Sequence, residues 1–134
     1  MRVLLDTHVL LWAVGDSGRL PPSSREILEN GNNEIFFSAA SIWEIAIKAA
    51  LGREDFQIDP VQILDVMPET GFTELPVMAR HAAEVSRLPA IHKDPFDRML
   101  IAQSRTEPLL LLTDDALLAR YSDNVRLISG QPAG

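Results

Sequence analysis

Short apolar runs alternate with longer amphipathic segments along the chain. The runs have the length and composition of buried strands, and they span Arg2 to Leu5, Glu34 to Phe37, Phe72 to Leu75, Leu109 to Leu112 and Val125 to Ile128. Alternation of such strands with helices favours a parallel sheet that is covered by helices on both faces. The pattern therefore predicts an α/β fold.

Helix-length segments lie between these runs, and several have a proline at the start or a glycine at the end, as helices commonly do. The predicted helices begin at about Val9 and cover Pro21 to Gly31, Ser38 to Gly52, Pro60 to Thr70, Val77 to Leu88 and Asp94 to about Glu107. We find no repeat, low-complexity tract or linker between them. We expect a single domain over residues 1–134.

The composition is that of a packed globular protein. With 134 residues, of which 46% are hydrophobic, the chain is long enough to bury roughly two thirds of its unfolded surface. The absence of cysteine excludes disulfides, thiolate zinc sites and cysteine nucleophiles. No apolar run approaches bilayer-spanning length, and no basic segment followed by a long apolar stretch opens the chain. We expect a soluble, cytoplasmic protein with no membrane partner.

The formal net charge is −7, which is the wrong sign for a protein that holds nucleic acid by bulk electrostatics. A nucleic-acid role would therefore require a local basic patch, a bound cation or a partner. Lys48, Lys93 and Arg98 could supply local positive charge, although ordinary surface charge is the simpler interpretation of each. A divalent-metal site would itself add acids to the count.

Acidic residues follow two of the predicted strands. Asp6 comes directly after Arg2 to Leu5, and Asp114 and Asp115 come directly after the run LLLLT. Ligands of open α/β sheets bind beyond the carboxyl ends of the strands, near the point where the strand order reverses. If these two strands are neighbours, their acids converge.

Each of these acids also has a purely structural explanation. Asp6 can cap the helix that follows it, and Asp115 can complement the start of a helix in ALLARY. Asp94, Pro95 and Asp97 fit the N-cap, first and third positions of another helix, where such residues are favoured. One acid alone therefore does not distinguish a helix cap from a functional site.

Glu44 differs because it lies inside the apolar helical segment SIWEIAIKAA. Helical spacing places Ser41, Glu44 and Lys48 on one narrow stripe. Either this stripe is solvated and carries a Glu44–Lys48 ion pair worth about 0.3 to 0.5 kcal/mol, or it faces a cleft.

Asp6, Glu44, Asp97 and Asp115 together give four carboxylates, three of them where the sheet meets the start of a helix. Clustered like charges repel, so such a group is stable mainly when a cation neutralises it. Ligands that are all oxygen favour a hard ion, magnesium or manganese, over zinc.

The histidines and tryptophans have simpler interpretations. His8 is a satisfied helix residue, although it could also be a metal neighbour or a proton carrier. We expect His81 on the surface of an amphipathic helix, His92 in a loop, and Trp12 and Trp43 in the core.

Four motifs in order along the chain, LLDTHVLLW, SAASIWEIAIK, HKDPFDRMLIAQS and LLLLTDD, resemble those of PIN-domain ribonucleases. Within that family the chain is similar to the VapC-type toxins of bacterial toxin-antitoxin (VapBC) pairs. The resemblance runs nearly end to end, and the motifs are specific in this order, whereas LLDT or TDD alone would not be. It implies a PIN-like three-layer sandwich with a mainly parallel sheet of four or five strands.

The resemblance also implies a site and a function. Carried over by motif, the family's catalytic and metal-ligating acids fall on Asp6, Glu44, Asp97 and Asp115, with Thr113 and Asp94 as supporting positions and Asp114 able to share the role of Asp115. A Mg²⁺ or Mn²⁺ ion in the acidic cleft would activate water for in-line attack on an RNA phosphodiester. Glu44 would ligate the ion directly or through water, or accept the water's proton. The implied partners are RNA, a second copy in a homodimer and a VapB-type antitoxin whose basic side chains would reach the acids.

Other enzyme and binding classes explain less of the pattern. Asp6-Thr7-His8 has the D-x-H opening of metallophosphoesterases, but their further Asn and His motifs are absent, and haloacid-dehalogenase-type phosphatases need an aspartate where His8 stands. The alternative from another class is a non-catalytic PIN-like module that binds RNA or protein and uses its acids as helix caps. Intact acids at all four motif positions favour the nuclease.

Overall fold

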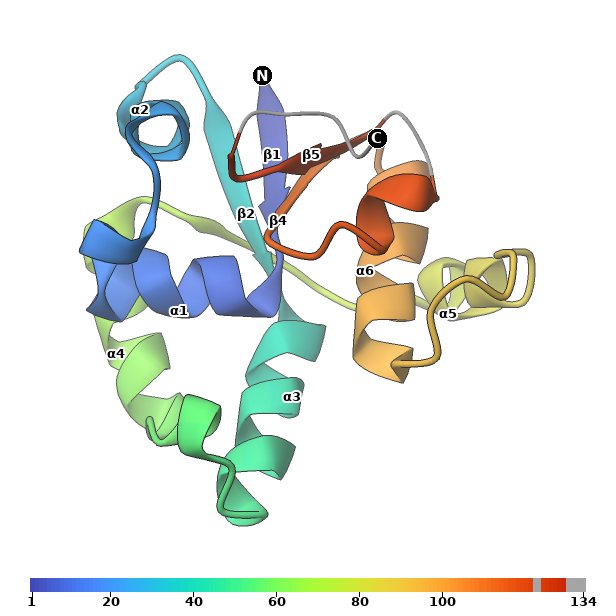
Figure 1. Cartoon of the computed structure of the whole chain (residues 1–134), viewed down its shortest axis with the longest axis horizontal. Coiled ribbons are helices and arrows are strands. Elements are labelled where there is room, and N and C mark those ends of the chain that lie inside the picture. The colour runs from blue at the N-terminus through green and yellow to red at the C-terminus, as the bar shows by residue number, and fades with distance from the viewer. Residues whose placement is uncertain (122–123, 130–134) are drawn as a thin grey trace.

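The computed structural model describes residues 1–121 and 124–129, and its centre is a five-stranded parallel sheet (Figure 1). The strands are β1 (Arg2–Leu5), β2 (Glu34–Ser38), β3 (Thr73–Leu75), β4 (Leu110–Thr113) and β5 (Val125–Leu127). They lie in the order β3-β2-β1-β4-β5, and every neighbouring pair is parallel. The five predicted strands are confirmed, with ends that differ by at most one residue.

The described residues also contain six α-helices and three short 3-10 turns. These are α1 (Thr7–Gly15), α2 (Pro22–Glu29), α3 (Ala39–Ala50), α4 (Pro60–Thr70), α5 (Ala79–Val85), α6 (Pro95–Thr106), η1 (Ser17–Arg19), η2 (Glu54–Phe56) and η3 (Leu118–Arg120). The predicted helix in ALLARY is wrong in extent, because only the single turn η3 forms there. Across the described ranges, none of these helices has the length and apolar character needed to cross a lipid bilayer.

The sheet separates two apolar cores, because alternate residues of a strand point to opposite faces. Val3 and Leu5 of β1 belong to the core on the side of α1, α3 and α4, whereas Leu4 belongs to the core on the side of α6. Figure 1 shows α1 and α4 on one side of the sheet and α5 and α6 on the other. The predicted three-layer α/β sandwich is confirmed.

The strand order reverses between β1 and β4. From β1 the chain first builds β2 and β3 on one side, and later builds β4 and β5 on the other. The two neighbours end together, since the N–H of Asp6 donates to the carbonyl of Leu112 at 3.0 Å. The predicted convergence of the acids after β1 and β4 is therefore confirmed, and it lies where open α/β sheets bind their ligands.

Candidate functional site

A cleft of about 410 Å³ opens at the carboxyl ends of β1 and β4. Its lining residues are Asp6, Thr7, His8, Glu44, Lys48, His92, Asp97, Asp114, Asp115 and Ala116. They come from the junction of β1 and α1, from α1, α3 and the first turn of α6, and from the segments after β4 and before α6. All four acids predicted from the sequence thus lie around one cleft.

Asp6 is both a helix cap and a cleft residue. One carboxylate oxygen accepts from the N–H of His8 at 2.9 Å, at the start of α1, and the other accepts from the Thr113 hydroxyl. The side chain is buried, and burial raises the pKa of Asp6 to about 6, with the charge of Asp114 adding to the rise and the Thr113 hydrogen bond opposing it. Its two oxygens let one carboxylate serve both roles.

The start of α6 places a second acid in the cleft. Asp94 caps the helix by accepting from the N–H groups of Phe96 and Asp97 at 2.8 and 3.1 Å, which confirms its predicted capping role. Asp97 then lies in the first turn with its carboxylate 3.3 Å from Nε2 of His92.

The pKa of Asp97 is raised further than that of Asp6. Burial, followed by the negative charges of Asp6, Asp94, Glu44 and Asp115, raises the pKa of Asp97 to about 8. Without a compensating cation, the neutral form of Asp97 is therefore favoured at neutral pH. This is the unbalanced charge expected of a site built to receive a cation.

Glu44 faces the cleft, so the interpretation of its stripe as solvated is wrong. Its side chain is only 3% exposed. Oε1 accepts from the Thr7 hydroxyl at 2.6 Å, and Oε2 accepts from Nζ of Lys48 at 2.5 Å. The predicted role of Glu44 as a metal ligand stays a prediction.

Lys48 is a cleft residue as well. Its Nζ lies 3.5 Å from a carboxylate oxygen of Asp94 in addition to the contact with Glu44. Burial acts to lower the pKa of Lys48, but the two carboxylates, Glu44 first, outweigh it and raise the pKa above its ordinary value. The side chain is therefore held as an ammonium ion.

The end of β4 supplies Thr113, Asp114 and Asp115. The N–H of Asp115 donates to the Thr113 hydroxyl at 3.0 Å, and one oxygen of Asp115 accepts from the N–H of Leu117 at 2.9 Å. The other oxygen lies 3.0 Å from Nε2 of His92. Asp114 is exposed and lines the same cleft.

His92 is the cleft residue that the sequence analysis missed. Its Nδ1 accepts the N–H of Asp94 at 3.0 Å, so the ring proton resides on Nε2, between Asp97 and Asp115. The ring thereby links the start of α6 to the end of β4. Its position two residues before the cap of α6 was the available signal.

The sequence matches the PIN domain family over residues 3–124. The chain belongs to the PIN domain family. No protein of curated function matches it significantly.

Solved structures share the fold of this PIN domain. VapBC2 from Rickettsia felis, bound to a DNA fragment from its promoter, is 18% identical, with a TM-score of 0.67 over 95% of this chain and 97% of that chain. DNA-bound VapBC from Salmonella typhimurium is 16% identical, with a TM-score of 0.66 over 95% and 96%. VapBC-1 from nontypeable Haemophilus influenzae is 14% identical, with a TM-score of 0.63 over 95% and 96%. At these identities the likeness shows the fold alone.

The donor groups of this PIN domain fit a divalent cation. Two sets, Asp6 with His8 and Asp114, and His92 with Asp97 and Asp115, each hold potential ligand atoms within 4.8 Å of one another, and because Nε2 of His92 carries the ring proton, the carboxylates are the donors of the second set. Most of these donors are carboxylate oxygens, which suit magnesium or manganese. The pKa of Asp97, which burial and then the surrounding negative charges raise, gives the same indication, because a cation would stabilise the buried carboxylate and relieve the repulsion.

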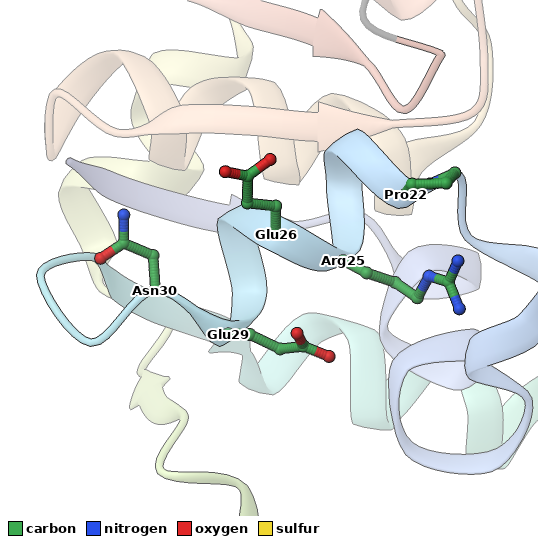
Figure 2. Close-up of a pocket in the computed structure, with 5 residues that line it drawn as sticks. All are labelled: Pro22, Arg25, Glu26, Glu29 and Asn30. Carbon is green, nitrogen blue, oxygen red and sulfur yellow. The ribbon is translucent and has the colours of Figure 1, made fainter.

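A second hollow, of about 520 Å³, lies along α2 and is lined by Pro22, Arg25, Glu26, Glu29 and Asn30. Figure 2 shows the side chains of Glu26 and Arg25 pointing in different directions, so no set of donors converges there. The hollow shares no residue with the acidic cleft. We therefore place the candidate site of the PIN domain at the cleft.

Proposed function

We propose that this PIN domain is a Mg²⁺- or Mn²⁺-dependent endoribonuclease that hydrolyses RNA phosphodiester bonds in the acidic cleft. The observation that carries the proposal is the convergence of acids at the β1/β4 switch point, where burial and then the neighbouring negative charges raise the pKa of Asp97 to about 8. Asp6, Asp97 and Asp115 are the proposed metal ligands, and Glu44 completes the acidic set. The bound cation would activate water and neutralise charge on the phosphate.

The surrounding residues of the chain would hold these ligands in place. The Thr113 hydroxyl and the N–H of His8 fix the two oxygens of Asp6. His92 spans Asp97 and Asp115, so it would keep two ligands from different elements at a constant separation. Preorganised ligands of this kind lower the cost of reaching the reactive arrangement.

The first test is cleavage of a mixed set of structured and single-stranded RNAs by the purified protein. We expect cleavage with Mn²⁺ or Mg²⁺, none with EDTA, and a loss of about a thousandfold in the rate for Asp6→Asn purified in parallel. The variant also controls for a contaminating nuclease. Equal cleavage by both proteins would contradict the proposal, and RNA binding without cleavage would favour the non-catalytic module.

We further propose that the protein is a VapC-type toxin inhibited by a VapB-type antitoxin. The proposal is supported by the four sequence motifs and by a fold shared with the VapBC structures. A homodimer is supported by an apolar hollow of about 580 Å³ between α3, α5 and α6, whose lining includes Trp43, Phe96 and Met99. Trp43 is 63% exposed, which is unusual for so large an apolar side chain in a monomer. Sedimentation analysis of the purified protein tests the homodimer.

Expression of the protein without an antitoxin is expected to slow bacterial growth, because uncontrolled RNA cleavage depletes essential transcripts. Asp97→Asn, expressed to the same level, should not slow it. Growth rate and viable counts after induction measure the effect. Normal growth with abundant wild-type protein would argue against the toxin role, while leaving ribonuclease activity to the cleavage assay.

A further inference from the structure

We propose that Lys48 binds the RNA phosphate at the bond to be cleaved, and that Glu44 and Asp94 are positioning residues for its ammonium group. The inference rests on the proposed ribonuclease function and assigns a substrate-binding residue to the same cleft. It also gives Glu44 a role other than ligating the metal.

The geometry of Lys48 is that of a held, cleft-facing cation. Its side chain is 17% exposed and lines the acidic cleft. The ammonium group has three N–H donors; Glu44 lies 2.5 Å away and Asp94 3.5 Å away. One donor remains for a phosphate oxygen in the cleft.

Two aromatic rings further restrict the ammonium group. Nζ of Lys48 lies 5.1 Å from the ring centroid of Phe56 and 5.9 Å from that of Phe96. Contacts of this kind are favourable for a cation. The two rings and the two carboxylates restrict the Lys48 side chain before a phosphate arrives. The side chain therefore loses less rotamer freedom when it binds the phosphate.

Charge balance favours a phosphate as the occupant. Lys48 is the one lysine or arginine among the described residues that line the cleft. The other candidates for local positive charge are placed elsewhere: Lys93 is exposed, and Arg98 donates to the carbonyls of Val85, Pro89 and His92. A phosphodiester entering a cleft of carboxylates needs a positive contact besides the metal, and Lys48 supplies it.

The contacts of Glu44 fit positioning better than metal ligation. The Thr7 hydroxyl contacts Oε1 and the Lys48 ammonium contacts Oε2, so a metal ion on Oε2 would lie beside a positive charge, and Glu44 belongs to neither set of converging donors in the described residues. Thr7 follows Asp6 directly, and its hydroxyl also lies 2.9 Å from Oγ of Ser41. This chain of contacts ties the position of Lys48 to the end of β1.

Lys48→Met tests the inference, with Lys93→Met as the matched control that removes the same charge from an exposed lysine. We expect Lys48→Met to lower kcat/KM for RNA cleavage about a hundredfold, and Lys93→Met to lower it by no more than about threefold. Binding of a fluorescent 2′-O-methyl oligoribonucleotide, checked for intactness after the assay, should weaken about tenfold in Lys48→Met. Calorimetry should show Mn²⁺ bound as tightly as by wild type or more tightly, since a competing positive charge is gone.

The double variant Lys48→Met/Glu44→Gln separates this role from a structural one, because it removes both partners of the buried ion pair and keeps the charge balance. Under the inference it cleaves as poorly as Lys48→Met. Recovery of wild-type cleavage would mean that Lys48 only neutralises Glu44 and would overturn the inference. Loss of Mn²⁺ binding in Glu44→Gln would overturn the positioning role of Glu44.

The outcomes also separate the inference from the proposed function. If wild type cleaves RNA and Lys48→Met cleaves as well as Lys93→Met, the inference is wrong and the nuclease stands. If wild type binds the oligoribonucleotide through Lys48 but cleaves no RNA, the nuclease is wrong and the phosphate contact stands. If wild type neither cleaves RNA nor binds the oligoribonucleotide, both are wrong.

Discussion

Asp97→Asn is expected to abolish RNA cleavage and, at the same time, to stabilise the metal-free protein at alkaline pH. Asparagine keeps the size of the side chain but removes a negatively charged ligand, so we expect the single-turnover rate in Mn²⁺ to fall about a thousandfold or more. The fold should persist, because the cap of α6 is Asp94 and not Asp97. A variant with near wild-type cleavage would remove Asp97 from the mechanism.

The gain in stability follows from the raised pKa of Asp97. The pKa is about 8 in the folded protein against an ordinary value of 3.8, so between these values the folded state binds more protons than the unfolded state. The free energy of unfolding therefore falls as pH rises from about 4 to about 8 in the absence of metal. Asparagine has no proton to lose, so Asp97→Asn should be more stable than wild type by up to about 5 kcal/mol at about pH 8, and by little at about pH 4.

Urea unfolding in EDTA at the two pH values measures this difference. Asp65→Asn, which changes an exposed aspartate of α4, is the matched control and should follow wild type at both. A variant that is less stable than wild type at alkaline pH would show that Asp97 is not under the repulsion described.

The position of the candidate site was predictable because its strands are unambiguous. The run LLLLT and the opening RVLL are too apolar and too short for anything but buried strands, and an acid follows each of them. What the sequence could not establish was whether these strands are neighbours. That follows from the sheet order, in which β4 pairs with β1 at Leu5 and Leu112.

Side-chain environment was harder to predict than element type. α3 is apolar over most of its circumference, so periodicity could not tell which face is buried, and Trp43 proves 63% exposed while Glu44 is 3% exposed. His81, expected on the surface, is fully buried. Its Nε2 lies 2.6 Å from a carboxylate oxygen of Glu107 at the C-terminal end of α6, and this contact satisfies the buried ring nitrogen. Partners so distant along the chain leave no local pattern.

Helix capping and site formation are not alternatives in this fold. Asp6, Asp94 and Asp115 each use one carboxylate oxygen to accept backbone N–H groups and face another side chain with the second. The backbone contact fixes where each carboxylate lies, so that Asp6 and Asp115 are held at defined positions in the cleft and Asp94 at a defined position beside Lys48. Sequence reasoning that weighs cap against ligand for one acid at a time therefore underestimates the site.

Manganese is expected to raise the melting temperature of the wild-type protein, and to do so far more at alkaline than at acidic pH. At a concentration about 100 times its Kd, Mn²⁺ stabilises the folded state by about 2.7 kcal/mol, which for a domain of this size corresponds to roughly 8 to 16 °C. Binding requires the carboxylate form of Asp97, whose pKa is about 8, so each pH unit below that value costs about tenfold in affinity.

Thermal melts with and without MnCl₂ at about pH 8 and about pH 6 measure the shift, which should shrink at the lower pH and be absent in Asp97→Asn at both. Equal shifts at the two pH values, or an unchanged shift in Asp97→Asn, would place the metal away from Asp97.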